Sequence, residues 1–187
     1  MNLYISVAKR AVENYIKNGT IIEPPENLPD DLLKKKSGVF VTIMKNGELR
    51  GCIGTYLATK KNIAQEIIAN AIAAATEDYR FGLITKEELP YLSYTVYILN
   101  TPEIVENEKK LDPKKYGIIV KTAPILSSQR SDVIFNGVVP AKSGLLLPDL
   151  EGIDTTEQQI SIACQKGRIN PKREKILIYR FTVEKHD

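Results

Sequence analysis

Residues 39–55 read VFVTIMKNGELRGCIGT, and they hold the clearest structural signal in the chain. The first six are mostly β-branched and apolar, which is typical of a strand. Asn46 and Gly47 separate this run from a second one over 49–55, and an Asn-Gly pair between two such runs is a strong signal for a β-hairpin. We therefore predict two antiparallel strands, with residues 50–55 on the returning strand.

Two helices are predicted around this hairpin. Apolar residues recur at helical spacing over 3–17, where Asn18-Gly19 supplies a stop, and again over 62–76, where Asn62 is placed to cap the start. The second helix is apolar over a broad face, so we expect it to be largely buried. Three prolines between residues 22 and 29 favour an extended connector.

The other predicted elements are shorter. Thr85 and Glu88 have capping-box spacing and predict a helical turn, and a second capping box over 154–157 predicts a helix that ends at Gly167. Charged residues over 103–115 are predicted to lie on the surface. Strands are predicted over 92–99, 117–121, 132–135, 144–148 and 176–184, with a further hairpin turn at 136–137. Strands and helices do not alternate regularly, so the predicted fold class is α+β with a mixed or antiparallel sheet.

Composition narrows the class of protein. The chain has 187 residues and 43% hydrophobic content, so we expect one domain, or two closely packed lobes. Cys52 and Cys164 have no CxxC spacing, and no apolar run is long enough for a secretory leader or a membrane span. Both are therefore interpreted as thiols in a reduced, cytoplasmic compartment. The net charge of +3, with both signs mixed along the chain, argues against a nucleic-acid partner.

Several kinds of chemistry are absent from the sequence. It has no GxxxxGK[ST] loop and no GxGxxG segment after a strand, which excludes nucleotide binding by those two routes. The single histidine, His186, is predicted to be frayed and would make a poor base for a cysteine. No metal site is predicted from one histidine and two cysteines, although carboxylates remain able to hold a hard metal ion. The sequence does not identify a cofactor.

Residues 49–55, Leu-Arg-Gly-Cys-Ile-Gly-Thr, resemble the signature of the AMMECR-type domain family. We name these residues the motif, and the predicted strand that contains them the motif strand. The similarity continues in the family's order through residues 70–75, 78–81, 87–89, 144–148 and 179–181. Two segments depart from the family pattern: residues 82–84 stand where relatives commonly have prolines, and the stretch 120–144 is longer than usual.

The resemblance implies a single domain over 1–187 with a two-lobed α+β fold. The N- and C-terminal segments would join in the larger lobe, and a cleft would lie near residues 50–52. The family has no settled activity. Its bacterial and archaeal members are associated with Memo-type and radical-SAM proteins, so the resemblance implies one of these as a partner in a shared pathway.

The candidate site residues lie in the matching segments. Arg50 and Cys52 are two residues apart, and such residues share a face of a regular strand. A guanidinium favours the thiolate form of a neighbouring cysteine and binds carboxylates or phosphates, so we hypothesise that these two residues are catalytic. The candidates for substrate binding are Gly51, Gly54, Thr55, Asn70, Asp78 and Arg80.

The candidates also have structural interpretations. Cys52 could be a small buried side chain, and Arg50 could join the lobes by pairing with an acid. Asp78 and Arg80 could form an ion pair, and Asn70 could hydrogen-bond the motif strand or lie at the surface. Two functions stay open: an enzyme or small-molecule-binding protein with a cleft at 50–52, and a non-catalytic interaction module in which the motif is structural. Cys164 is predicted to lie in the core.

Overall fold

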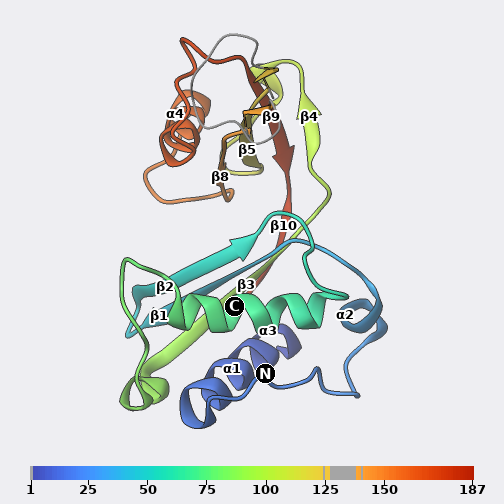
Figure 1. The fold of residues 1–187 in the computed structure, drawn as a ribbon, viewed down its shortest axis with the longest axis vertical. Helices are drawn as coiled ribbons and strands as arrows, with labels where there is room; N and C mark the ends of the chain where they lie inside the picture. The colour runs from blue at the N-terminus through green and yellow to red at the C-terminus, as the bar shows by residue number, and fades with distance from the viewer. Residues whose placement is uncertain (1, 124, 127–137, 140) are drawn as a thin grey trace. The chain divides into compact units, whose positions relative to one another are not determined.

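A computed structural model describes residues 2–123, 125–126, 138–139 and 141–187 (Figure 1). The chain divides into two compact units, which we name unit 1 (Met1–Asn100 and Glu184–Asp187) and unit 2 (Thr101–Val183). Each unit contains an antiparallel sheet and helices. The predicted α+β fold class is therefore confirmed.

Unit 1 is built on a four-stranded sheet with the strand order β10-β3-β1-β2. Asn46 and Gly47 have positive φ angles of 52° and 87°, which the two-residue turn of this kind of hairpin requires, and the predicted hairpin is confirmed. The strands are β1 (Val39–Lys45), β2 (Glu48–Thr55), β3 (Leu92–Leu99) and β10 (Val183–His186).

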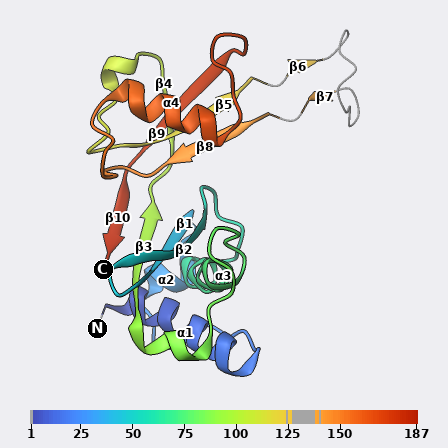
Figure 2. The same cartoon turned by 90° about the vertical axis from the view of Figure 1, so that its left-hand side faces the viewer.

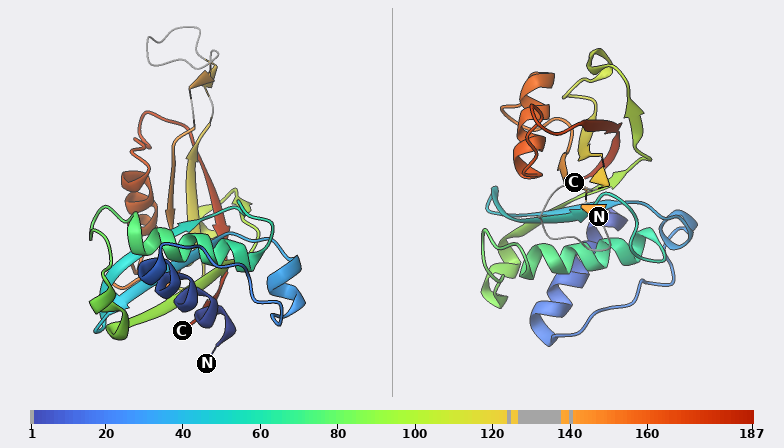
Figure 3. Two further views of the ribbon diagram at one scale, coloured as in Figure 1. Left: turned by 60° about the horizontal axis from the view of Figure 1, so that its bottom comes forward. Right: turned by 45° about the horizontal axis from the view of Figure 1, so that its top comes forward.

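Two helices, α1 (Leu3–Asn18) and α3 (Ile63–Thr76), lie side by side on one face of this sheet, in dark blue and green in Figure 3. Both caps follow the sequence: Gly19 ends α1 in the left-handed conformation, and the Asn62 side chain accepts from the Gln65 N–H at the start of α3. The shorter elements are α2 (Asp30–Lys34) and the 3-10 turn η1 (Lys86–Tyr91). In the described residues, no helix is both long enough and apolar enough to cross a bilayer.

Unit 2 has its own four-stranded sheet, in the order β4-β9-β5-β8. Helix α4 (Thr156–Lys166) packs against β8 and β5, as Figure 2 shows, and Cys164 on this helix is 2% exposed, so its predicted place in the core is confirmed. The other elements are β4 (Glu103–Val105), η2 (Glu108–Lys110), β5 (Gly117–Thr122), β8 (Ser143–Leu146), β9 (Ile176–Phe181) and the paired β6 (Ile125–Leu126) and β7 (Val138–Val139).

Several boundaries differ from the sequence prediction. The run over 176–184 is two strands, because β9 pairs in unit 2 whereas β10 joins the sheet of unit 1. Strand β4 lies in the segment 103–115, for which the sequence predicted a surface position but no strand, because charged and exposed residues give no alternating apolar pattern. The cap of α4 is Thr155 with Gln158, one residue later than predicted, because glutamine completes this box as glutamate does. The predicted strand 132–135 and turn 136–137 lie outside the described residues.

His186 is ordered in β10, so the prediction of a frayed histidine is wrong. Its ring stacks on that of Tyr4, with the ring centroids 3.7 Å apart and the planes 8° from parallel. Both residues belong to unit 1, where the two chain ends are marked in Figure 2. A tertiary contact therefore overrides the usual tendency of such a position to fray.

Candidate functional site

Strand β2 contains a β-bulge within the motif. Ile43 of β1 pairs with Gly51 and Met44 pairs with Leu49, so Arg50 is an extra residue between two paired ones. A bulge interrupts the alternation of side chains along a strand. The rule by which Arg50 and Cys52 were predicted to share a face therefore does not apply here.

The Arg50 side chain is held by η1 and by the loop before it. Its Nε and Nη2 donate to the two carboxylate oxygens of Glu88, at 2.9 and 3.1 Å. Its Nη1 and Nη2 also donate to the carbonyls of Gly82 and Leu83, at 3.1 and 2.9 Å. Arg50 is thus directed to Glu88 rather than to the Cys52 thiol, and it pairs with an acid of its own unit instead of joining the lobes.

The pair of Arg50 and Glu88 is mostly buried. The exposed fractions of the two side chains are 14% and 13%. Hydrogen bonding from Arg50 lowers the pKa of Glu88 to about 2, against the opposing effect of burial, and the Thr85 N–H and Lys45 add to this lowering. We conclude that Arg50 braces β2 against η1.

The two glycines of the motif are required by close packing. A Cβ atom on Gly51 would lie 2.2 Å from the carbonyl oxygen of Ala74 on α3. A Cβ atom on Gly54 would lie 2.2 Å from the Phe40 ring and 2.5 Å from the Val39 carbonyl oxygen on β1. Both distances are far below van der Waals contact, so any larger residue would separate β2 from its neighbours.

A buried carboxylate fixes the end of β2. Glu66 of α3, which is 1% exposed, accepts hydrogen bonds from the Thr55 hydroxyl (2.7 Å), from the hydroxyl and N–H of Thr59 (2.8 and 2.7 Å) and from the Lys60 N–H (2.7 Å). Burial by itself raises the pKa of Glu66, but these four bonds outweigh it and hold the pKa below its ordinary value. Thr55 is thereby tied to α3.

Asn70 lies one turn further along α3 and is also buried. Its Nδ2 donates to the Val39 carbonyl oxygen at 3.2 Å and to the Thr55 hydroxyl at 3.3 Å. The hydrogen bond from Asn70 to the motif strand, one of two predicted alternatives, is therefore confirmed.

Cys52 is a half-buried residue of β2 with a free thiol. The Thr42 hydroxyl of β1 donates to its Sγ at 3.3 Å, and its own backbone N–H donates to Oδ2 of Asp78 at 2.9 Å. The same carboxylate accepts from Nε and Nη2 of Arg80, at 2.9 and 2.7 Å. The predicted ion pair of Asp78 and Arg80 is confirmed, and the buried acid holds the Arg80 guanidinium beside the motif strand.

The charges around Cys52 follow from this arrangement. The hydrogen bonds from Arg80 lower the pKa of Asp78 to about 2, although burial opposes them, and the Cys52 N–H adds to the lowering. The pKa of Arg80 is raised mainly by Asp78, and the negative charge of a Cys52 thiolate raises it further. The Arg80 side chain is 45% exposed, and its guanidinium lies over the Phe81 ring at 5.1 Å. The cation near the thiol is therefore Arg80.

The histidine is not placed to act on Cys52. Strands β10 and β2 are the two edges of the sheet, so three strand spacings of about 4.8 Å, roughly 14 Å in all, separate them. Within the described part of the chain, no group of three or more His, Cys, Asp or Glu side chains is arranged to hold a metal ion.

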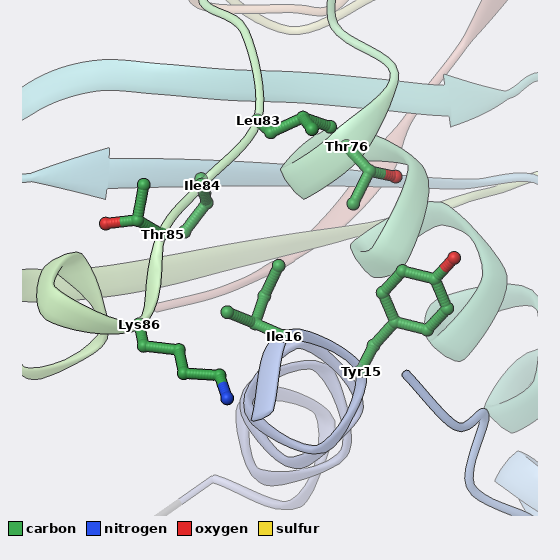
Figure 4. A pocket seen from close by; sticks show the side chains of 7 residues that line it. All are labelled: Tyr15, Ile16, Thr76, Leu83, Ile84, Thr85 and Lys86. Atoms are coloured by element: carbon green, nitrogen blue, oxygen red, sulfur yellow. The ribbon is translucent and has the colours of Figure 1, made fainter. Parts of the chain in front are cut away.

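Two cavities of unit 1 lie on its helical side. One, of about 450 Å³, lies between α3 and the connector around Ile22. The other, of about 360 Å³, is shown in Figure 4, where Tyr15 and Ile16 of α1 and Thr76 of α3 lie across from the loop 83–86. Tyr15 lines both cavities, and neither is lined by Cys52.

Sequence reasoning did not identify three residues of the site, which are Glu66, Glu88 and Thr42. Glu66 lies four residues before the predicted candidate Asn70, on a helix predicted to be buried. Two polar residues on one face of a buried helix need hydrogen-bond partners, so this spacing could have indicated partners on the motif strand. Glu88 was identified only as a cap. Thr42 would face Gly51 in a regular two-residue hairpin, and only the bulge moves it opposite Cys52, so no local signal could have found this pair.

Comparisons with known proteins identify one family and several relatives. The chain matches AMMECR1 over residues 5–186. It is similar to a Thermotoga maritima protein, with 47% identity over 98% of this chain and 96% of the relative. It is also similar to Protein CA_C1420 of Clostridium acetobutylicum, with 39% identity over 98% of this chain but only 35% of that longer protein. Among solved structures, Uncharacterized Protein PH0010 from Pyrococcus horikoshii has a TM-score of 0.78 and 31% identity, over 98% of this chain and 88% of that one.

Proposed function

Because the chain belongs to the AMMECR1 family, and the names of these relatives state no activity, we propose its function from geometry: it binds a small anionic molecule at the Cys52 thiol. The observation that carries this proposal is the bridging position of Asp78. One buried carboxylate binds both the Cys52 N–H and the Arg80 guanidinium, so the thiol and a partly exposed cation are held together.

Arg80 is the residue that we assign to the anion. A guanidinium has five N–H donors, and Asp78 takes the Nε donor and one on Nη2. In the part of the chain that the structure describes, no other acceptor is seen for the Arg80 side chain, so donors remain for a carboxylate or a phosphate. Among the other candidates, Arg50, Thr55 and Asn70 direct their polar groups inward and are assigned to positioning β2.

An arrangement of Cys52 beside Arg80 fits either an enzyme or a binding protein. In an enzyme the Cys52 sulfur would be the nucleophile, and in a binding protein it would be one contact among several. Both require the anion to be drawn to Arg80. The charge of Arg80 is therefore the feature to test first.

The test is capture of small molecules from a cell extract, read by mass spectrometry. We expect wild-type protein to retain an anionic compound, and Arg80→Gln to retain about tenfold less, because a hydrogen bond to a charged group contributes about 1.5 kcal/mol. Cys52→Ser shows whether the thiol contributes to the retention. The matched control is Arg10→Gln, an exposed arginine of α1, which removes the same charge elsewhere in unit 1 and should retain as much as wild type. Equal retention by Arg80→Gln and Arg10→Gln would contradict the proposal.

We infer a second candidate function from the Clostridium relative. The matched region is 35% of that protein, so a domain of this kind is joined there to a longer polypeptide. This favours an interaction module, with the Memo-type or radical-SAM proteins implied by the family resemblance as its partners. If wild-type protein retains no small molecule, this second function becomes the better one.

A further inference from the structure

Asn2 connects the first turn of α1 to β10. Its Oδ1 accepts from the Tyr4 N–H at 3.0 Å and so caps the helix. Its Nδ2 lies 3.3 Å from Nδ1 of His186, and the His186 ring stacks on Tyr4. Three side chains thus join residues that are far apart in the sequence but belong to the same unit.

The helix cap determines which nitrogen of His186 carries the proton. Because Oδ1 of Asn2 is occupied by the cap, the group that faces the imidazole is the NH₂ group, which can only donate. Nδ1 of His186 must therefore accept, and the neutral ring carries its proton on Nε2. Among the described residues, Nε2 is buried without a hydrogen-bond partner.

Protonation removes this hydrogen bond, because Nδ1–H and the Asn2 NH₂ group are both donors. Burial disfavours the charged ring and lowers the pKa of His186, whereas Glu184 on β10 and the following Asp187 oppose the lowering. Asp187 is itself paired with Lys185 at 2.7 Å. Tyr4, which stacks on the ring, is also near Glu184 and near the ion pair between Asp31 of α2 and Lys35, the residue that caps the end of this helix.

We propose that Asn2, Tyr4 and His186 form a proton-sensitive clasp, which fastens β10 to α1 when the imidazole is neutral and loosens when it is protonated. Strand β10 is short and lies at an edge of the sheet beside β3. An edge strand of this length gains little from its own backbone pairing. Strand β10 therefore stays ordered only while the clasp holds, and acidification exposes the edge of β3.

The experiment is an NMR titration of the full-length protein. His186 is the only histidine, so the imidazole signals need no assignment. We expect the Nε2–H tautomer at neutral pH, a midpoint below 6.5 and, as the ring gains its proton, a loss of about tenfold in hydrogen-exchange protection at residues 184–186. In His186→Phe, which keeps an aromatic ring for stacking, this protection should no longer depend on pH.

The Asn2→Asp variant gives the sharper comparison. Aspartate keeps the helix cap but offers an acceptor to the imidazole, so the midpoint should rise by about 1 unit. The control is Asn27→Asp, which makes the same change at an exposed position of the connector and should leave the midpoint unchanged. An Nδ1–H tautomer, a midpoint equal in Asn2→Asp and wild type, or protection at 184–186 that does not follow the titration would overturn the clasp.

Discussion

Arg50 and Arg80 flank the same strand, yet they have different roles because they meet different carboxylates. Arg50 is 14% exposed, and Glu88 and two carbonyls occupy its guanidinium. Arg80 is 45% exposed and shares Asp78 with the Cys52 N–H. Both pairs are bidentate and both acids are mostly buried, but only the Arg80 guanidinium is half-exposed, so only Arg80 keeps donors for a ligand.

Glu88 should make stability depend on pH. Its pKa is lowered from 4.5 to about 2, so its contribution is complete above pH 4.5 and is lost as the pH falls toward 2. We expect Glu88→Gln to lower the free energy of unfolding at neutral pH by about 3 kcal/mol, because it leaves the Arg50 charge buried without its partner. Urea unfolding at neutral pH measures this loss of free energy, and a second measurement at about pH 3 shows how the free energy of unfolding depends on pH.

The control for this prediction is Glu87→Gln, the same change at the exposed neighbouring residue. The pKa of Glu87 is also lowered, mainly by a hydrogen bond from the Thr85 side chain, but its carboxylate is exposed and has no buried cation as a partner. Glu87→Gln should therefore change the free energy of unfolding and its pH dependence much less than Glu88→Gln does. If Glu88→Gln behaved in the same way as Glu87→Gln, the bracing role of Arg50 would be wrong.

Among the elements, the β1–β2 hairpin could be predicted closely from the sequence, but its bulge could not. The turn depends on Asn46 and Gly47, which act locally. The bulge depends on contacts distant in sequence, between Gly51 and Ala74 and between Arg50 and Glu88. The split of the last apolar run at Thr182 has the same cause, since nothing in a continuous run shows that its halves join different sheets.

The close packing of β2 on α3 should make the stability of the protein depend on the glycine at position 51. We expect Gly51→Ala to destabilise the protein by about 2 kcal/mol or more, because its Cβ would lie 2.2 Å from the Ala74 carbonyl oxygen. Thermal unfolding followed by circular dichroism measures this loss. Since the clash involves backbone, adding Ala74→Gly should not restore stability.

Gly47→Ala is the comparison, because a Cβ there meets no atom within 4 Å. Its cost should be about 1 kcal/mol, from the positive φ alone. A Gly51→Ala protein that is no less stable than Gly47→Ala would show that β2 does not need this close approach.

For the whole molecule, the fold class and the family could be predicted because both depend on many segments in a fixed order. The match over residues 5–186 and the TM-score of 0.78 reflect that order. The site could be predicted only in part. Asp78, Arg80 and Asn70 were recognisable as polar residues in apolar or matching segments, whereas the roles of Thr42, Glu66 and Glu88 depend on which segments meet in the folded chain.

If Arg80 attracts anions to the Cys52 thiol, as proposed, its charge should change the ratio of Cys52 alkylation rates with iodoacetate and iodoacetamide. The same sulfur attacks the CH₂ carbon of both reagents and displaces iodide, but only iodoacetate is an anion. Cys164 is buried, which raises its pKa, so it should react little, and Cys52→Ser measures that background. We predict that the ratio falls about fivefold in Arg80→Gln, which corresponds to about 1 kcal/mol of attraction between unit charges, and stays at the wild-type value in Arg10→Gln. The same ratio in all three proteins would contradict the role proposed for Arg80.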